Sequence, residues 1–456
     1  MRKYALFLLC TLLGFSTSAQ VVNSLDSMRQ QFEQDVARMR ADFEAYEAQA
    51  RADYERYVQS IKSVWGGDTI VDNTKKVWVE YGKDYRSRSI VNFEKGGVEV
   101  EVTVDESEKQ DTSLIDTRLV EAVRRMLDSR GSTCPYPSSV DVSVPLTEKP
   151  ILDGLIDFSS FDITASLMTA EMLPKSNRPA PPKPTVKGKV LDVIQRSEVQ
   201  EVKKEEVRKE TSGKTLAERR KESRERAVQK KNLLDRMTDK AVIARKIVAQ
   251  SKKKVTAVKG ADGKSRQVFQ IQLNLVSDNL SRNAALYKDL VAEFSNRFQI
   301  EQPLIYAIME QESAFNPQAK SWVPAYGLMQ LVPKSGGADA YRYVYHKDWI
   351  PTQSYLFNPR NNIELGTAYL RVLMNQFASV SDVHCRRLCV IAGYNTGAGN
   401  VSRAFIGTTN LGRAFSLIES FDYNGLYNHL IANLPHSETR NYVVKVTQRR
   451  EKYLKK

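Results

Sequence analysis

The feature that most constrains the fold of this 456-residue chain is a regular run of apolar residues from Leu25 to Trp65. Their mean spacing is about 3.6, which is the period of a straight amphipathic helix rather than of a supercoiling heptad. The run ends at Gly66-Gly67, so the sequence predicts one long helix over residues 25–65. The pattern leaves open whether this helix packs on its own domain or binds a partner.

After the helix, apolar residues recur with a period of two, which is typical of strands. The turn Glu94-Lys95-Gly96-Gly97 joins two of the runs and favours a hairpin. We therefore predict a small antiparallel sheet, with Glu99, Glu101 and Thr103 on a solvent-exposed face. The expected elements are strands at 77–81, 89–93 and 98–104, a helix at 114–127 and an extended run at 140–144, in an α+β domain spanning residues 20–175.

A Pro-rich and basic linker is expected next, over residues 176–264. Residues 196–254 hold 20 basic and 10 acidic residues, and the tail 449–456 holds five and one, which together account for the net charge of +14. The folded parts are therefore close to neutral, and no basic motif interleaves with aromatic residues, so nucleic-acid binding is not expected. The linker is a solvated helix or tether, or it adheres to an anionic wall polymer or membrane surface.

The first 19 residues resemble a cleavable secretory signal. Arg2 and Lys3 precede an apolar run, and Ala19 ends a stretch of small residues. We therefore expect an exported protein in the periplasm or cell envelope. Cys10 leaves lipidation, and with it association with an outer membrane, open.

The remaining cysteines and histidines do not form a metal-binding pattern. Cys385 and Cys389 are four residues apart on an expected helix, which favours buried thiols over a disulfide. The histidines are scattered and make no CxxC or HExxH arrangement. No metal or cofactor is predicted.

The C-terminal part carries an acidic residue in an unusual place. Alternating residues at 268–275 indicate a strand that returns to the N-terminal sheet, within a connector at 265–278, and residues 279–448 are helical in pattern. In the expected helix from Pro303, Glu312 continues the apolar stripe of Ile305 and Ile308, whereas Glu310 faces away and can be solvated. Burial near a helix C-terminus disfavours a carboxylate, so Glu312 should retain its proton, as a general acid must.

Several further motifs occur in order along the C-terminal part. They are Glu312-Ser313, the run from Ala325 to Gln330, Asn358-Pro359 with Asn362 and Gly366, the run from Gly393 to Gly399, and the run from Pro435 to Tyr442. Together they resemble the Slt-type lytic transglycosylase domain. The N-terminal half, with its long helix ending at Trp65-Gly66 and the hairpin turn at Glu94-Gly97, is similar to the N-terminal domain of the membrane-bound lytic murein transglycosylase C family.

This resemblance implies an all-α, lysozyme-like catalytic domain over residues 279–448 and a substrate of peptidoglycan glycan strands. It implies that Glu312 is the catalytic acid and base. The residues implied to bind or support substrate are Ser313, Met329, Gln330, Tyr394, Asn395, Glu438 and Tyr442.

The expected reaction is non-hydrolytic cleavage of the MurNAc to GlcNAc bond, with 1,6-anhydro ends. Hydrolysis of a glycoside ordinarily requires two carboxylates, and only one is convincingly placed here. An intramolecular attack by the muramyl 6-hydroxyl removes the need for the second. Two alternatives stay open: a hydrolytic muramidase of the goose-lysozyme kind, and a non-catalytic wall-binding scaffold. The sequence leaves endo or exo cleavage, stem-peptide preference, the role of the N-terminal domain and the oligomeric state undecided.

Overall fold

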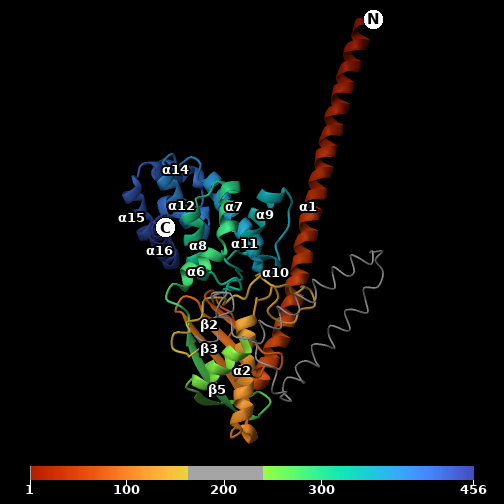
Figure 1. Ribbon diagram of the computed structural model, residues 1–456. Coiled ribbons are helices and arrows are strands. Elements are labelled where there is room, and N and C mark those ends of the chain that lie inside the picture. The colour runs from red at the N-terminus through yellow and green to blue at the C-terminus, as the bar shows by residue number, and fades with distance from the viewer. Residues whose placement is uncertain (1, 163–239, 456) are drawn as a thin grey trace, which may run out of the picture. The chain divides into compact units, whose positions relative to one another are not determined.

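The computed structural model describes residues 2–162 and 240–455, with side chains from residue 26 onward (Figure 1). The chain divides into two compact units, one formed by Met1–Asp157 with Lys252–Lys456 and the other by Phe158–Ser251. In the second unit, residues 240–250 form a helix. The prolines and most of the charged residues of the predicted linker lie outside the described residues.

The long helix predicted from the apolar spacing is present as part of α1 (Arg2–Trp65). It ends at Gly66, whose φ of 78° lies in the left-handed region, and a Cβ there would come within 2.4 Å of the Lys259 carbonyl oxygen. The indole of Trp65 is buried and donates to the carbonyl of Tyr85 at 2.6 Å. The C-terminal turns of α1 therefore pack on the chain's own sheet.

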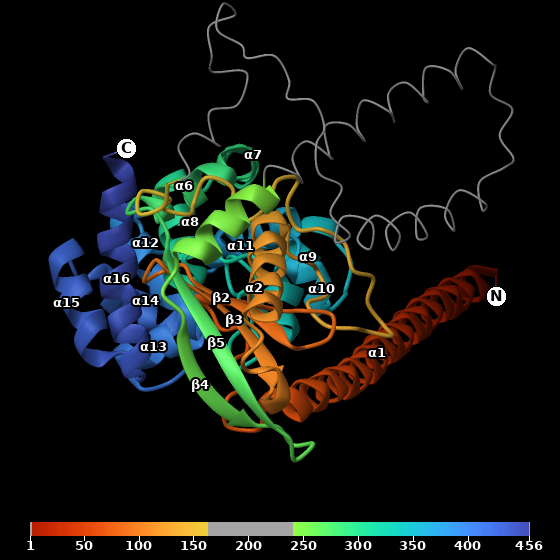
Figure 2. The same cartoon turned by 60° about the horizontal axis from the view of Figure 1, so that its bottom comes forward.

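The sheet has five antiparallel strands in the order β1-β2-β3-β5-β4. Pairing of β5 with β3 confirms the predicted return of the chain to the N-terminal sheet (Figure 2). The sequence analysis did not identify β4, which lies in the segment assigned to the linker. Strand β4 is short, lies at the edge of the sheet and is almost entirely exposed. Because it buries no face, its sequence lacks the alternation of apolar residues that indicates a strand. The strands are β1 (Val77–Tyr81), β2 (Ser87–Asn92), β3 (Gly97–Asp105), β4 (Lys254–Lys259) and β5 (Ser265–Asn274).

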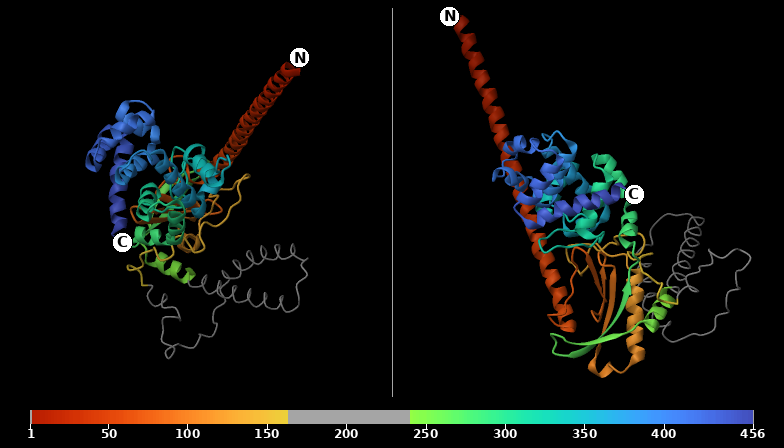
Figure 3. Two further views of the ribbon diagram at one scale, coloured as in Figure 1. Left: turned by 90° about the horizontal axis from the view of Figure 1, so that it is seen from above. Right: turned by 90° about the vertical axis from the view of Figure 1, so that its left-hand side faces the viewer.

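Both faces of the central strands of this sheet are covered, which corrects the prediction of a solvent-exposed face. Helix α2 (Thr112–Asp128), with the short η1 (Glu106–Glu108) before it, packs on the face formed by the buried valines of β3. The C-terminal end of α1 covers the opposite face, as the view of the sheet between the two helices shows (Figure 3). Glu101 and Thr103 are therefore buried. The period of two placed them on one face, but only tertiary packing covers that face.

Burial of Glu101 depends on a charged partner. Arg88, the residue opposite it on β2, donates to Glu101 at 2.6 Å, and its guanidinium lies 4.0 Å from the ring centroid of Trp65. Both charged side chains are almost inaccessible to solvent. The ion pair and the cation–π contact thus allow a carboxylate beneath α1.

The extended run predicted at residues 140–144 is not a strand. Val142 is 81% exposed, and Val140 and Val144 are also exposed. The segment is held by local hydrogen bonds between Thr133 and the backbone of residues 142 and 144, and it joins no sheet ladder. Alternation alone was insufficient, because a strand also requires a paired neighbour.

The C-terminal domain is mostly helical, as predicted. Cys385 and Cys389 are buried free thiols on α12, which confirms their expected state. Among the described residues, no helix is long and apolar enough to cross a membrane. The elements are α6 (Asn279–Leu286), α7 (Lys288–Phe298), α8 (Gln302–Ser313), η2 (Pro333–Gly337), α9 (Ala338–Tyr345), α10 (Gln353–Phe357), α11 (Pro359–Gln376), α12 (Val383–Thr396), α13 (Ala398–Ile406), α14 (Leu411–Glu419), α15 (Tyr423–Asn433) and α16 (Ser437–Leu454).

The buried pair in the sheet gives a first prediction. Replacement of Arg88 by Met should destabilise the protein by about 3–5 kcal/mol, because it leaves the Glu101 carboxylate buried without a countercharge. The double substitution Arg88→Met with Glu101→Leu should cost clearly less, since it removes both charges. Denaturant unfolding of the three proteins tests this, and equal losses for the single and double variants would contradict it.

Candidate active site

Glu312 lies in the last turn of α8, with Pro303 in the first turn as predicted. The helix stops there because Ala314 and Phe315 adopt left-handed conformations, with φ of 49° and 64°. Helix α8 packs against α16, and Glu312 is only 5% exposed. The backbone therefore holds this carboxyl in the interior, at the end of a helix where neighbouring carbonyl dipoles disfavour negative charge.

Glu310, expected to be solvated, is also buried, so that prediction was wrong. Its carboxyl accepts from Lys452 at 2.8 Å and from the Tyr453 hydroxyl at 2.5 Å, and Arg449 lies 3.4 Å away. These partners belong to the segment predicted to be a basic tail, which instead continues α16. Their charges and hydrogen bonds overcome the burial of Glu310 and keep its pKa below the ordinary value.

The pKa of Glu312 moves in the opposite direction. Burial raises it above the ordinary glutamate value, and the nearby Glu438 adds to the rise. Lys75 and the Tyr442 hydroxyl stabilise the carboxylate and oppose the rise without cancelling it. The expected direction of the pKa shift of Glu312 is therefore confirmed. The pKa of Glu310 shifts the other way because the two carboxyls have different partners, although both are buried.

Ser313 holds together the two segments that flank the carboxyl. Its side chain has no exposed surface, and its hydroxyl lies 2.9 Å from the Met309 carbonyl oxygen and 2.8 Å from that of Leu328. It also accepts from the Phe315 backbone N–H at 3.1 Å. These bonds fix the end of α8 to the loop that carries Leu328. Contact of Ser313 with a substrate stays a prediction.

The loop from Tyr326 to Leu331 is a tight turn that requires glycine. Gly327 has φ of 76°, and a Cβ would lie 2.3 Å from the Leu356 carbonyl oxygen. Gln330 also has a positive φ, and its amide donates to the backbone oxygens of Ala319 and Gly327. Within the described structure, the buried side-chain oxygen of Gln330 accepts no hydrogen bond.

Met329 lies beneath this turn and is fully buried. Asn362 accepts from the Met329 N–H at 2.7 Å and donates to the Tyr326 and Leu356 carbonyls. A Cβ on Gly366 would lie 2.3 Å from the Met329 sulfur. Asn362 and Gly366 of α11 therefore support the turn.

Tyr394 and Asn395, at the end of α12, join the turn to α16. The Tyr394 hydroxyl donates to the Met329 carbonyl at 2.8 Å, and the Asn395 side chain accepts from Thr439 at 2.7 Å. Burial and the neighbouring Glu312 raise the pKa of Tyr394 well above its ordinary value. Tyr394 therefore stays a neutral hydroxyl beside the carboxyl.

The first turns of α16 supply Glu438 and Tyr442. Glu438 is exposed, whereas Tyr442 is 3% exposed with its hydroxyl beside Glu312. That hydroxyl lowers the pKa of Glu312, and within the part of the chain described it makes no hydrogen bond to another acceptor. It is thus free to donate to the carboxylate once Glu312 loses its proton.

Lys75 also lies at this site, although no sequence pattern indicated it. It lies in the loop before β1, and its ammonium nitrogen is 3.5 Å from Oε2 of Glu312. The two residues are 237 positions apart. No spacing or motif in the sequence relates them, so only the folded chain brings them together.

The structure therefore gathers most of the predicted residues around one carboxyl. Met329, Gln330 and Tyr394 lie on one connected network, and Tyr442 and Glu438 approach from α16. No group of three or more His, Cys, Asp or Glu in residues 2–162 and 240–455 is placed to hold a metal ion. The arrangement can transfer a proton and orient polar groups through its own side chains.

Comparison with known proteins agrees with this geometry. Residues 289–414 match the family model described as Transglycosylase SLT domain, and residues 19–129 match that of the membrane-bound lytic murein transglycosylase C, N-terminal domain. The two matches lie in different parts of the chain. The first match includes Glu312 and Asn395 but ends before α16, which completes the site in the structure.

Curated relatives carry the same name as the second model. Membrane-bound lytic murein transglycosylase C of Klebsiella pneumoniae (strain ATCC 700721 / MGH 78578) is 39% identical over 202 residues, 44% of this chain and 55% of the relative. The protein of that name from Sodalis glossinidius is 40% identical over 189 residues, covering 41% and 52%. The chain thus matches about half the length of these relatives.

The opposite environments of the two glutamates give a second prediction. The pKa of Glu312 is raised by folding, so its cost to stability appears as pH rises from the ordinary glutamate pKa through the raised one. At pH 7, Glu312→Gln should raise Tm by roughly 2–4 °C, the effect of about 1 kcal/mol in a domain of this size. Near pH 4 the gain should vanish, because wild-type Glu312 is then protonated in both states.

Glu310→Gln is the matched control. Folding lowers the pKa of Glu310, so its stabilisation is present above the ordinary glutamate pKa and is lost as pH falls through the lowered one. The substitution should cost about 2 kcal/mol at pH 7, less than for a fully buried pair because Lys452 is partly exposed. Thermal unfolding at both pH values measures the effects, and shifts of the same sign at pH 7 would refute the contrast.

Proposed function

We propose that this protein is a lytic transglycosylase that cleaves the MurNAc to GlcNAc bond of peptidoglycan. The observation that carries the proposal is the buried Glu312, whose pKa burial raises, surrounded by the two tyrosine hydroxyls and the Gln330 turn. The other buried carboxyl of α8, that of Glu310, has partners that lower its pKa instead. The SLT-domain match and the names of the relatives support the same activity.

The reaction needs only one carboxyl. Glu312 donates its proton to the glycosidic oxygen as the bond from that oxygen to C1 of MurNAc breaks. The muramyl 6-hydroxyl then attacks C1 and returns its proton to the Glu312 carboxylate, so no water is consumed and the acid is regenerated. The Tyr442 hydroxyl stabilises the carboxylate between these two steps.

The neighbouring residues are proposed to contact the sugar. The side-chain oxygen of Gln330 is available to accept a hydrogen bond from an amide or hydroxyl group of the substrate. The family resemblance extends such contacts to Ser313, Met329, Tyr394, Asn395 and Glu438. In the structure, the polar groups of Ser313 and Tyr394 are engaged with backbone carbonyls, so their first effect is to shape the site.

The relatives' name also supports a place in the cell envelope. Residues 1–19 are proposed to direct export to the periplasm, and Cys10 allows attachment to an outer membrane. Adhesion of the basic linker to a wall polymer or membrane surface is part of this proposal and rests on its charge alone.

Product analysis of purified sacculi is the direct test. Mass spectrometry should find 1,6-anhydromuramyl ends, whereas a goose-type muramidase would give products heavier by one water. Glu312→Gln should lower the rate by about 10²–10⁴-fold, the usual contribution of a general acid or base. Equal wall clearance by wild type and Glu312→Gln would instead favour the non-catalytic scaffold.

Tyr442→Phe isolates the proposed support of the carboxylate. The substitution removes one hydroxyl from a buried ring and keeps the packing of α16 against α8. Activity should fall on the order of tenfold, because the carboxylate formed in the first step loses a hydrogen-bond donor. Initial rates of anhydro-product release measure this, and an unchanged rate would remove Tyr442 from the mechanism.

A further inference from the structure

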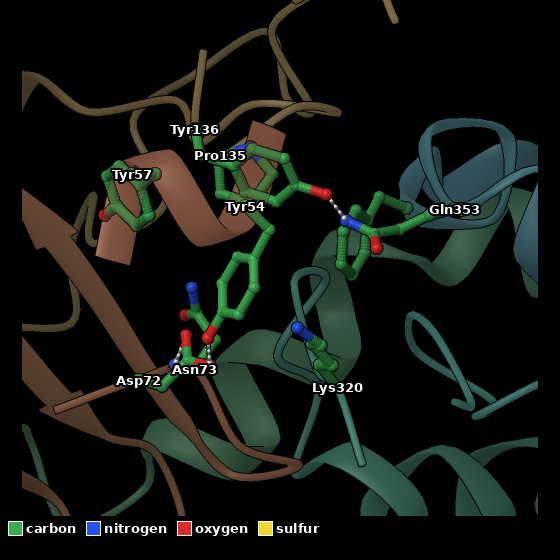
Figure 4. A pocket seen from close by; sticks show the side chains of 9 residues that line it. Tyr54, Tyr57, Asp72, Asn73, Pro135, Tyr136, Lys320 and Gln353 are labelled. Atoms are coloured by element: carbon green, nitrogen blue, oxygen red, sulfur yellow. Dashed lines mark hydrogen bonds between the residues drawn. The ribbon is translucent and has the colours of Figure 1, made fainter. Parts of the chain in front are cut away.

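The loop before β1 is built to present Lys75 in a fixed position. The Thr74 backbone N–H donates to the Val77 carbonyl at 3.0 Å, and the Val77 backbone N–H donates to the Thr74 hydroxyl at 3.2 Å. Just upstream, the Tyr54 hydroxyl of α1 donates to Asp72, beside Asn73 (Figure 4). Lys75 is therefore at the tip of a constrained turn.

This turn is docked onto the segment that follows Glu312. The Asn316 side chain is fully buried and donates to the carbonyls of Thr74 and Val77 at 3.3 and 3.4 Å. Gln318 accepts from the indole of Trp78 at 2.6 Å and donates to the Ser132 carbonyl at 2.6 Å. Four hydrogen bonds of buried amide side chains thus join the N-terminal domain to the segment that follows α8.

The docked turn places one cation against the candidate catalytic acid. The Lys75 ammonium is 3.5 Å from Glu312, and the lysine side chain is 37% exposed whereas that of the glutamate is 7% exposed. The neighbouring Lys76 pairs instead with Glu94, within the N-terminal domain. Of these two adjacent lysines, Lys75 therefore contacts Glu312 and Lys76 contacts a different carboxylate.

We propose that Lys75 is a positioning residue through which the N-terminal domain orients the Glu312 carboxyl and stabilises its ionised form during catalysis. The inference rests on the proposed function, because it assigns Glu312 the two roles of acid and base. In the first role Glu312 must hold a proton, and in the second it must exist as a carboxylate. Lys75 favours the second state.

The other groups facing Glu312 show why such a cation is needed. Glu438 from α16 repels the carboxylate, and burial disfavours it, whereas the Tyr442 hydroxyl from α16 favours it. Tyr394 from α12 stays neutral beside it. Among the described groups that lower the pKa of Glu312, the Lys75 ammonium has the largest effect. Without it the carboxyl would bind its proton too strongly to donate it readily.

The test is Lys75→Met in the full chain, with Lys76→Met as the matched control. Removal of the charge from position 75 destabilises the Glu312 carboxylate, so the basic limb of the kcat/KM profile should move to higher pH. At the optimum pH, kcat should fall on the order of tenfold while KM changes little, since a weaker acid donates its proton more slowly. Lys76→Met should keep the wild-type profile and rate.

Lys75→Arg should restore most of the rate and the position of the basic limb, because it retains the charge. A wild-type pH profile in Lys75→Met would overturn the proposal. So would a rise in activity or a fall in KM, which would mean that Lys75 obstructs the substrate. An equal loss in the Met and Arg variants with no movement of the limb would show a purely structural role.

The same assay separates this inference from the proposed function. If wild-type protein releases no 1,6-anhydro products from sacculi, the transglycosylase proposal fails. If wild type does release them and Lys75→Met keeps the wild-type pH profile, only the role of Lys75 fails. Thermal unfolding of each variant at pH 7 shows whether the protein remains folded.

Discussion

The candidate site depends most on the burial of the Glu312 carboxyl, because its partners do not offset the cost of removing a carboxylate from water. Glu312 sits at the C-terminal end of α8, in the core between α8, α12 and α16, and burial raises its pKa because an anion there lacks water. Glu310, two residues earlier, is buried to almost the same extent and behaves in the opposite way, since it has Lys452, Arg449 and Tyr453 as partners. Burial alone therefore does not decide whether the pKa of a carboxyl is raised or lowered. The charged and hydrogen-bonding groups beside the carboxyl decide it.

Much of the surrounding site exists to hold that carboxyl in place. Ser313 ties the end of α8 to the Gln330 turn, Asn362 supports the turn from α11, and Tyr394 joins it to α12. These polar side chains are almost fully committed to backbone partners. Motif residues that look like ligands in the sequence thus act in the structure first as a frame, and the groups left available are few: the oxygen of Gln330 and the hydroxyl of Tyr442.

Side-chain hydrogen bonds connect the N-terminal domain directly to this frame. Asn316 and Gln318, which follow α8, bind the loop and strand that begin the sheet, and Lys75 reaches Glu312 from that loop. This arrangement gives the N-terminal domain a direct electrostatic influence on the carboxyl. The role of the domain therefore includes the chemistry of the site, if the proposed pH profile of Lys75→Met is observed.

The sequence by itself determined the local elements and singled out one candidate acid. Apolar periods of 3.6 and two predicted α1, the first three strands, α2 and the returning strand β5, and the stripe through Ile305 and Ile308 singled out Glu312. These predictions succeeded because they depend on the direction of side chains along a single element.

Only the tertiary structure decided what covers each face. The period of two could not show that α1 lies over Glu101, nor could helical spacing show that the extension of α16 neutralises Glu310. The polar edge strand β4 and the contact of Lys75 with Glu312 likewise depend on segments far apart in the chain. Charges and hydrogen bonds act through space, so the sequence singled out the candidate acid, whereas the fold determined which groups shift its pKa.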